Sequence, residues 1–128
     1  MQIQCDLLRF GLFPGVEKCS WNPVERLEWL GMKWDFNIGG ISISNKRIQK
    51  CKAQGELIYK TWPSVSFRDV ASFVGKVSSM HQVFEGRGNL HTRFLQMIIN
   101  TRHFYECSWD KKIFSDDLEV FDRAKSEI

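Results

Sequence analysis

The sequence predicts an α+β fold in which a short helix and a β-hairpin precede a bundle of three helices. Two observations carry this prediction. Apolar residues nearly alternate along residues 27–43, as in half-buried strands, and from residue 44 onward they recur every three to four residues, as in helices. With 128 residues and 43% hydrophobic content, the chain can form the core of one ordinary domain. We divide it into residues 1–43, 44–105 and 106–128.

The first segment begins with a predicted helix over residues 2–10. Ile3, Leu7 and Phe10 share one helical face, and Gly11 is well placed to end the helix. The residues from Val16 to Trp21 are then expected to form a short strand.

A hairpin is predicted next. The run from Leu27 to Phe36 reads as one strand with Gly31 at its centre, Asn37–Gly40 as a turn, and Ile41 to Ile43 as the returning strand. Glycine inside a strand often marks a bulge or the close approach of another backbone. The hairpin therefore needs a partner that explains Gly31.

The first two bundle helices have clear start and stop signals. Ser44 is a suitable N-cap for a helix that ends at Trp62-Pro63, although a mid-helix glycine, Gly55, costs about 1 kcal/mol relative to alanine. The second helix is predicted over Ser66–Phe84. Ser66 and Asp69 form a capping box, flanked by a hydrophobic staple of Val65 and Val70.

Asn89 is the predicted cap of a third helix, and Ser115 the predicted cap of a last one with Asp116 and Asp117 in its first turn, where acidic residues favour the helix dipole. The residues expected to face inward from the third helix are Leu90, Phe94, Met97, Ile98, Thr101 and Tyr105.

Positive charge is concentrated in the middle segment. Residues 44–105 hold ten basic and three acidic side chains, whereas residues 1–43 hold four and five, and residues 106–128 hold four and seven. A polyanion-binding surface requires such segregation, and a solvated basic face is the simpler alternative.

The four cysteines and three histidines lack metal-ligand spacing, so we expect no metal site and reduced thiols. We find neither an apolar run of membrane-spanning length nor a signal-peptide pattern, and so expect no membrane partner and an intracellular protein, cytoplasmic or nuclear.

The helix predicted over Ser66–Phe84 has an outer face of mostly small residues. Gly75 lowers helix stability without serving as a cap, so it requires a packing or binding reason. Serine hydroxyls beside it can bond phosphate or sugar oxygens, while close helix–helix packing inside the bundle is the structural alternative. This face consists of Arg68, Ser72, Gly75, Ser79 and Gln82, with Lys76 at its border.

Four motifs, in order, resemble the C-terminal part of the polymerase region of retroviral and retrotransposon reverse transcriptases. They are Leu7–Leu12, Glu17–Cys19, Glu28–Met32 and Ser66–Val77. The later residues, from Leu90–Leu95 to Ser108–Asp110, are most similar to elements related to the DIRS group, which carry a tyrosine recombinase.

The resemblance implies a role for each motif. Lys18 matches the lysine of the last palm motif, an auxiliary group near the leaving pyrophosphate. The helix beginning at Ser66 matches the thumb helix along the template–primer duplex, with contacts from Arg68, Ser72, Gly75, Lys76 and Ser79. The primer grip, which holds the primer 3′ end, is matched by Trp29, Leu30, Gly31 and Met32. Residues 1–43 would then be the end of the palm, 44–105 the thumb, and 106–128 the start of the connection segment.

The family's catalytic aspartates are not matched. Reverse transcriptases hold two Mg²⁺ ions through a Tyr/Phe-x-Asp-Asp motif upstream of the primer grip. Phe114-Ser115-Asp116-Asp117 has these residue types but follows the thumb, so we interpret it as a helix start. We therefore expect no catalytic residues and no cofactor in this chain, and no polymerase activity from it alone.

Three functions remain open. The chain is expected to be a fragment of a retroelement reverse transcriptase that holds the primer terminus and template–primer duplex, with the rest of the polymerase as a further partner. One alternative is a non-catalytic nucleic-acid-binding module derived from a retroelement. Another is an interaction domain without a nucleic-acid role, which the basic middle segment counts against.

Overall fold

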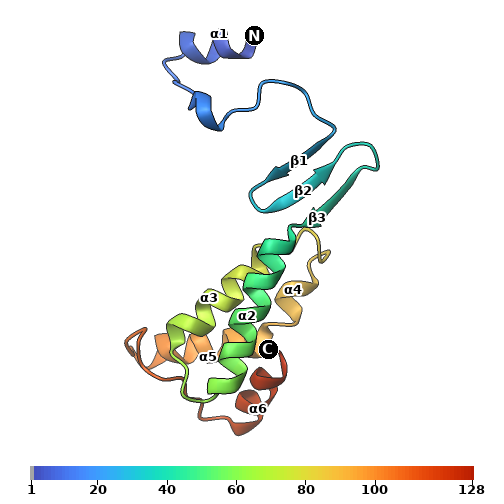
Figure 1. Ribbon diagram of the computed structural model, residues 1–128. Helices are drawn as coiled ribbons and strands as arrows, with labels where there is room; N and C mark the ends of the chain where they lie inside the picture. The colour runs from blue at the N-terminus through green and yellow to red at the C-terminus, as the bar shows by residue number, and fades with distance from the viewer. Residues whose placement is uncertain (1) are drawn as a thin grey trace.

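The chain forms an antiparallel sheet followed by a bundle of helices, which confirms the predicted α+β class. The computed structural model describes residues 2–128; Met1, the first residue of the first predicted segment, lies outside them. The N-terminal helix lies at one end, the sheet in the middle, and the bundle at the other end (Figure 1).

The first helix is confirmed as α1 (Gln2–Arg9), and the chain turns at Gly11 with φ of +73°. No residue of α1 is buried, and Ile3 and Phe10 remain 69% and 81% exposed. The strand predicted from Val16 to Trp21 is wrong: Val16–Lys18 form a single turn of 3-10 helix instead. A strand requires a ladder partner, and these residues have none among residues 2–128.

The sheet has three strands rather than the two that were predicted. Strands β1 (Arg26–Trp29), β2 (Met32–Asp35) and β3 (Gly40–Ile43) pair antiparallel in that order. Gly31 is therefore not inside a strand. Leu30 and Gly31, with φ of +52° and +74°, form the two-residue turn between β1 and β2, the positive φ pair that a type I′ hairpin requires.

One face of this sheet is apolar. Pairing Trp29 with Met32, and Met32 with Ile43, puts alternate residues of all three strands on the same side. Met32 and Ile43 are each 8% exposed, whereas Trp29 is 58% exposed. Burial on this face therefore increases from the edge strand β1 toward β2 and β3, the strand that leads into α2.

Helix α2 (Asn45–Thr61) follows β3 through Ser44, which is the N-cap although its side chain makes no capping bond. The structure explains the glycine within it. A Cβ on Gly55 would lie 3.2 Å from Cε2 of Phe73, so the glycine lets α2 and the next helix pack closely.

Helix α3 (Phe67–Ser78) starts as predicted. Ser66 Oγ accepts a hydrogen bond from Asp69 N at 3.2 Å, and the staple residues Val65 and Val70 are both buried. Its predicted end at Phe84 is wrong. The helix stops at Ser78, and the chain forms turns before Gly86, because Met80 folds inward and Ser79 Oγ bonds the carbonyl of Lys76.

The third predicted helix is two helices, α4 (Arg87–Leu90) and α5 (Arg93–Phe104). Asn89 therefore lies within α4, and Thr92 precedes α5. This shift changes the inward face: Leu95 and Ile98 are fully buried, while three of the residues expected inside, Leu90, Met97 and Tyr105, are 67%, 42% and 47% exposed.

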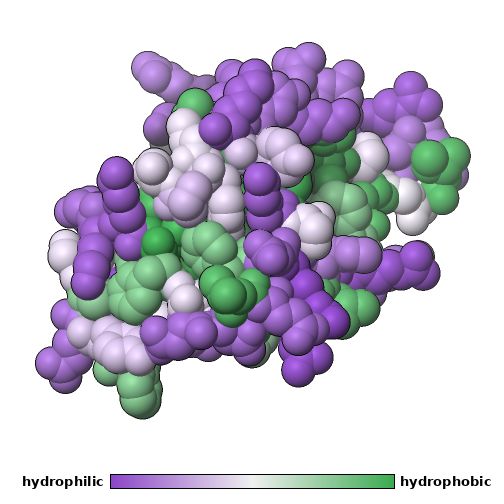
Figure 2. Space-filling view, turned by 90° about the horizontal axis from the view of Figure 1, so that it is seen from below, coloured by the Kyte–Doolittle hydropathy of each residue, from purple (hydrophilic) through white to green (hydrophobic). Residues whose placement is uncertain are grey.

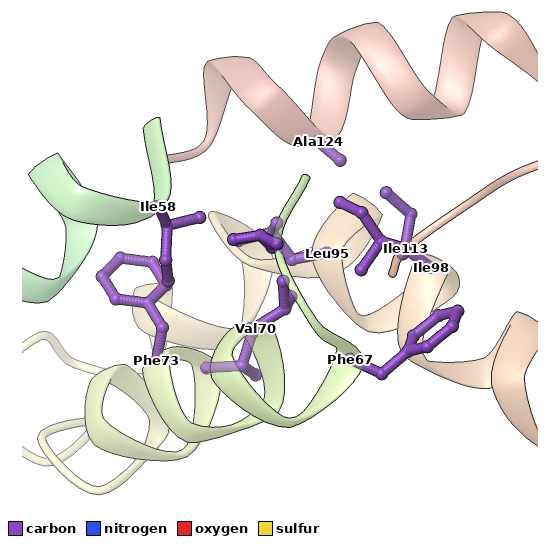
Figure 3. Close-up of a cluster of buried hydrophobic side chains, with 10 residues drawn as sticks. Ile58, Phe67, Val70, Phe73, Leu95, Ile98, Ile113 and Ala124 are labelled. Atoms are coloured by element: carbon purple, nitrogen blue, oxygen red, sulfur yellow. The ribbon is translucent and has the colours of Figure 1, made fainter. Parts of the chain in front are cut away.

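Helix α6 (Leu118–Ser126) packs on α5 and shares its core. The N-cap is Asp117, two residues after the predicted Ser115. Ile113 and Ala124 join the buried cluster, so the packed helical unit extends beyond residue 105. Figure 3 shows this cluster, in which Phe67 and Val70 of α3 meet Leu95 and Ile98 of α5; the other labelled members are Ile58, Phe73, Ile113 and Ala124.

Candidate nucleic-acid interface

The outer face of α3 is open. Arg68, Ser72, Gly75 and Ser79 are all exposed, and a Cβ on Gly75 would meet no atom within 4 Å. Helix packing among the described residues therefore does not account for Gly75. This face therefore exposes a strip of helix backbone around Gly75, flanked by the hydroxyl groups of Ser72 and Ser79, that a bulky ligand can approach.

The cation at the start of this face is paired. Arg68 Nε lies 2.8 Å from Asp110 Oδ1, and its Nη2 lies 3.3 Å from Oδ2. The hydrogen bond and the charge of Arg68 lower the pKa of the Asp110 carboxyl below its ordinary value, and Asp110 raises the pKa of Arg68 in return. Arg68 is therefore a weaker anchor for phosphate than a free cation at the same position.

Lys76 borders the face on the side of α2. Its amine bonds Oε1 of Gln54, whose Nε2 donates to the carbonyl of Asp69 at 3.2 Å. Lys76 and Gln54 also line a groove of about 560 Å³ between α2 and α3, together with Leu57. The amine of Lys76 thus lies at the edge of a groove that runs beside the open face.

The sequence reasoning missed two lysines of α2. Lys46 and Lys50 are exposed, and neither pairs with a carboxylate among residues 2–128. Their spacing puts them on the flank of α2 that continues through Ala53 and Leu57, which line the same groove. The sequence shows that these four residues are spaced i, i+4, i+7 and i+11. It does not show which flank of α2 lies next to α3.

The turn predicted as a primer grip is a compact hairpin loop. Trp29 and Leu30 are 58% and 70% exposed, so both side chains are available to a ligand. Met32 is buried and pairs with Ile43 of β3, so its side chain offers no binding surface. Glycine is required at position 31 for two reasons. Its φ is +74°, which disfavours other residues, and a Cβ there would lie 3.1 Å from Cδ of Arg47.

Arg47, in the first turn of α2, joins this turn to α3. Its Nη1 donates to the carbonyl of Leu30 at 2.6 Å, and its Nη2 donates to Ser79 Oγ at 2.5 Å. The β1–β2 turn and the end of the open face are therefore linked through one guanidinium. Sequence reasoning missed Arg47, since nothing local indicates that its partners are 17 and 32 residues away.

Lys18 is not part of this constellation. It is exposed in the 3-10 turn, and its amine has no partner among the described side chains. Figure 1 shows this turn on the far side of the sheet from the bundle. The structure brings together the hairpin turn and α3 and leaves Lys18 apart from both.

Asp116 and Asp117 have structural roles. Asp117 Oδ1 accepts from Glu119 N at 2.9 Å and from Val120 N at 3.2 Å. Asp116 accepts a hydrogen bond from the Tyr105 hydroxyl, and this bond raises the pKa of Tyr105. Among the described residues no three His, Cys, Asp or Glu side chains gather as metal ligands. The residues present do not fit the two-Mg²⁺ site of the family that the sequence resembles.

The opposite end of the molecule presents a mixed surface. Figure 2 shows hydrophilic side chains interrupted by separate apolar patches on the face at the α6 end. Apolar residues exposed on these helices include Leu57, Phe104 and Leu118, at 62%, 80% and 77%. No helix within residues 2–128 combines the length and hydropathy of a membrane span.

No family model, curated protein or solved structure matches this chain. A functional assignment must therefore come from its residues and their geometry.

Proposed function

We propose that this chain is the palm-end, primer-grip and thumb part of a retroelement reverse transcriptase and that it holds a template–primer duplex without performing catalysis. The observation that carries the proposal is the open strip around Gly75, because no described residue places an atom within 4 Å of the position a Cβ would take there. Serine hydroxyls flank the strip, and Lys76 lies at its border. The helical spacing of Lys46 and Lys50 puts them on the flank of α2 that lines the adjoining groove.

The chemistry of this surface suits a ligand of any base sequence. Cations provide affinity through the phosphates, and a strip without large side chains admits the backbone without reading base edges. A polymerase requires such sequence-independent binding. Arg47 links the β1–β2 turn to the end of the strip, and the exposed Trp29 and Leu30 side chains there suit the end of a nucleic-acid strand.

A second candidate is a non-catalytic nucleic-acid-binding module derived from such an element. The position of Lys18 favours it, because this residue of the last palm motif lies apart from both the hairpin turn and α3. The two candidates differ in what they require of the ligand. A primer-gripping unit should prefer a duplex with a recessed 3′ end, whereas a general module should bind blunt and recessed duplexes equally.

The test is binding of a fluorescent RNA–DNA hybrid between 50 and 200 mM salt. If Lys46, Lys50 and Lys76 each neutralise one phosphate, log Kd should change with log salt with a slope of roughly 3. Gly75→Leu should weaken binding about tenfold, or about 1.4 kcal/mol, because the side chain fills the strip. Gly15→Leu is the matched control, since Gly15 also has open space around it and lies outside the helical bundle.

Affinity that is insensitive to salt and to Gly75→Leu would contradict duplex binding by α3. Equal affinity for blunt and recessed duplexes, with the salt and Gly75 effects intact, would favour the general module over the primer-gripping unit.

A further inference from the structure

The sheet and the bundle are joined by few contacts apart from the covalent link between β3 and α2. The carbonyl of Gly31 accepts a hydrogen bond from Ser44 N at 3.1 Å, which extends the β2–β3 ladder into the cap of α2. Arg47 provides a second polar link, because it bonds Leu30 in the turn and Ser79, the C-cap of α3. Leu30 and Ser79 are far apart in sequence and both bond this side chain.

Arg47 is held in place on both sides. It lies in the first turn of α2, where the helix fixes its backbone, and its side chain is half-buried. Gly31 leaves room for the Arg47 stem, with the position of a Cβ only 3.1 Å from Cδ and from Nη1. Ser79 is itself fixed, since its hydroxyl donates to the carbonyl of Lys76 at 2.7 Å while it accepts from Arg47.

We propose that Arg47 is a positioning residue that couples the β1–β2 turn to the C-terminal end of α3. The planar guanidinium is suited to this role, because its separate N–H groups bond two acceptors at fixed angles, which a lysine ammonium cannot reproduce. When the outer face of α3 binds a duplex, the coupling holds the β1–β2 turn in a defined position beside that ligand. This second statement rests on the proposed function, whereas the coupling itself is a property of the free protein.

The free protein provides the first test, by ¹⁵N relaxation of the Leu30 and Gly31 amides. Ser79→Ala removes the α3 end of the bridge while leaving the turn sequence unchanged. We expect the order parameters of both amides to fall from about 0.85 to below about 0.6. Ser72→Ala, on the same helix face but without a bond to Arg47, should leave them unchanged. Unchanged order parameters in Ser79→Ala would overturn the coupling, whether or not the protein binds nucleic acid.

Arg47→Lys separates positioning from charge. It should retain the salt dependence of duplex binding, since the positive charge remains, and should still show the mobile turn of Ser79→Ala. If the turn of Arg47→Lys were as rigid as that of the unaltered protein, the bidentate bridge would be refuted, and Arg47 would have only an electrostatic role.

Duplex binding tests the functional half. Arg47→Ala and Ser79→Ala should each lower the affinity for a recessed-end duplex at least about fivefold, the lower end of coupling between linked sites. The double variant should lose no more than Arg47→Ala alone, because both changes break one link. Additive losses would contradict the coupling. Absence of binding by the unaltered protein would instead refute the proposed function, and the relaxation result would stand.

Discussion

Gly55 and Phe73 bring α2 and α3 into close contact, since the Phe73 ring occupies the space beside the helix backbone where a side chain would otherwise project. The bundle therefore uses a glycine on α2 where the helices pack closely, and it carries a second glycine, Gly75 on α3, where none of the described residues packs.

The two glycines should respond oppositely to substitution. Gly55→Leu should lower the free energy of unfolding by about 1–3 kcal/mol, because the added side chain overpacks against Phe73. Gly75→Leu should raise it by about 0.5–1 kcal/mol, since leucine favours helix and meets open space there. Urea unfolding measures both. A similar loss in the two variants would mean that Gly75 also packs within the fold.

Glu127 links the end of the chain to the start of α5. Its two carboxylate oxygens accept hydrogen bonds from Phe94 N at 3.1 Å and Leu95 N at 3.0 Å, where Thr92 provides no side-chain cap. Glu127→Ala should destabilise the protein by about 1.5–3 kcal/mol, as for loss of bonds to a charged group. Glu56→Ala, an exposed glutamate of α2, is the control and should stay within about 0.5 kcal/mol in urea unfolding. Equal effects of the two changes would exclude a capping role.

The Arg68–Asp110 pair predicts a direction of pH dependence. Arg68→Gln should raise the pKa of Asp110 toward its ordinary value of 3.8, because the hydrogen bond and the nearby charge are lost. Since folding lowers the pKa of Asp110, the stabilisation is present above pH 3.8 and is lost as pH falls through the lower pKa of the folded state. Carbon-13 NMR titration of the Asp110 carboxyl measures the shift. Arg87→Gln, which removes a cation that faces Glu85 instead, should leave the titration unaltered.

Local signals predicted much of this fold. The cap and staple around Ser66 and the end of α2 before Pro63 were correct because neighbouring residues determine them. Gly31 was misplaced because Leu27–Phe36 alternates almost without a break, and the turn becomes visible only from the cross-strand pairing of Trp29 with Met32. The α4–α5 boundary failed for a related reason: Asn89 and Thr92 are both acceptable caps, and burial of Leu95 decides between them.

The candidate site was predictable only in part. The small-residue face of α3 follows from periodicity, whereas the lysines of α2 and the bridge from Arg47 depend on how two helices and a hairpin pack. Met32 also shows that the site depends on packing that the sequence does not reveal. It belongs to the motif around the turn, yet the register with Ile43 buries it.

Asp117 provides the sharpest test of whether the Asp116-Asp117 pair serves the fold or a metal. As a cap, it can be replaced by asparagine within about 0.5 kcal/mol, whereas Asp117→Ala should cost about 1 kcal/mol in urea unfolding. Asp122→Ala, on the same helix, controls for the loss of charge. As a metal ligand, Asp117 would instead require its full charge, and Mg²⁺ alone would raise the Tm of the unaltered protein but not of Asp117→Asn. We expect no such Mg²⁺ effect and no primer extension by the unaltered chain, because the Asp117 carboxylate accepts two hydrogen bonds from backbone amides of α6.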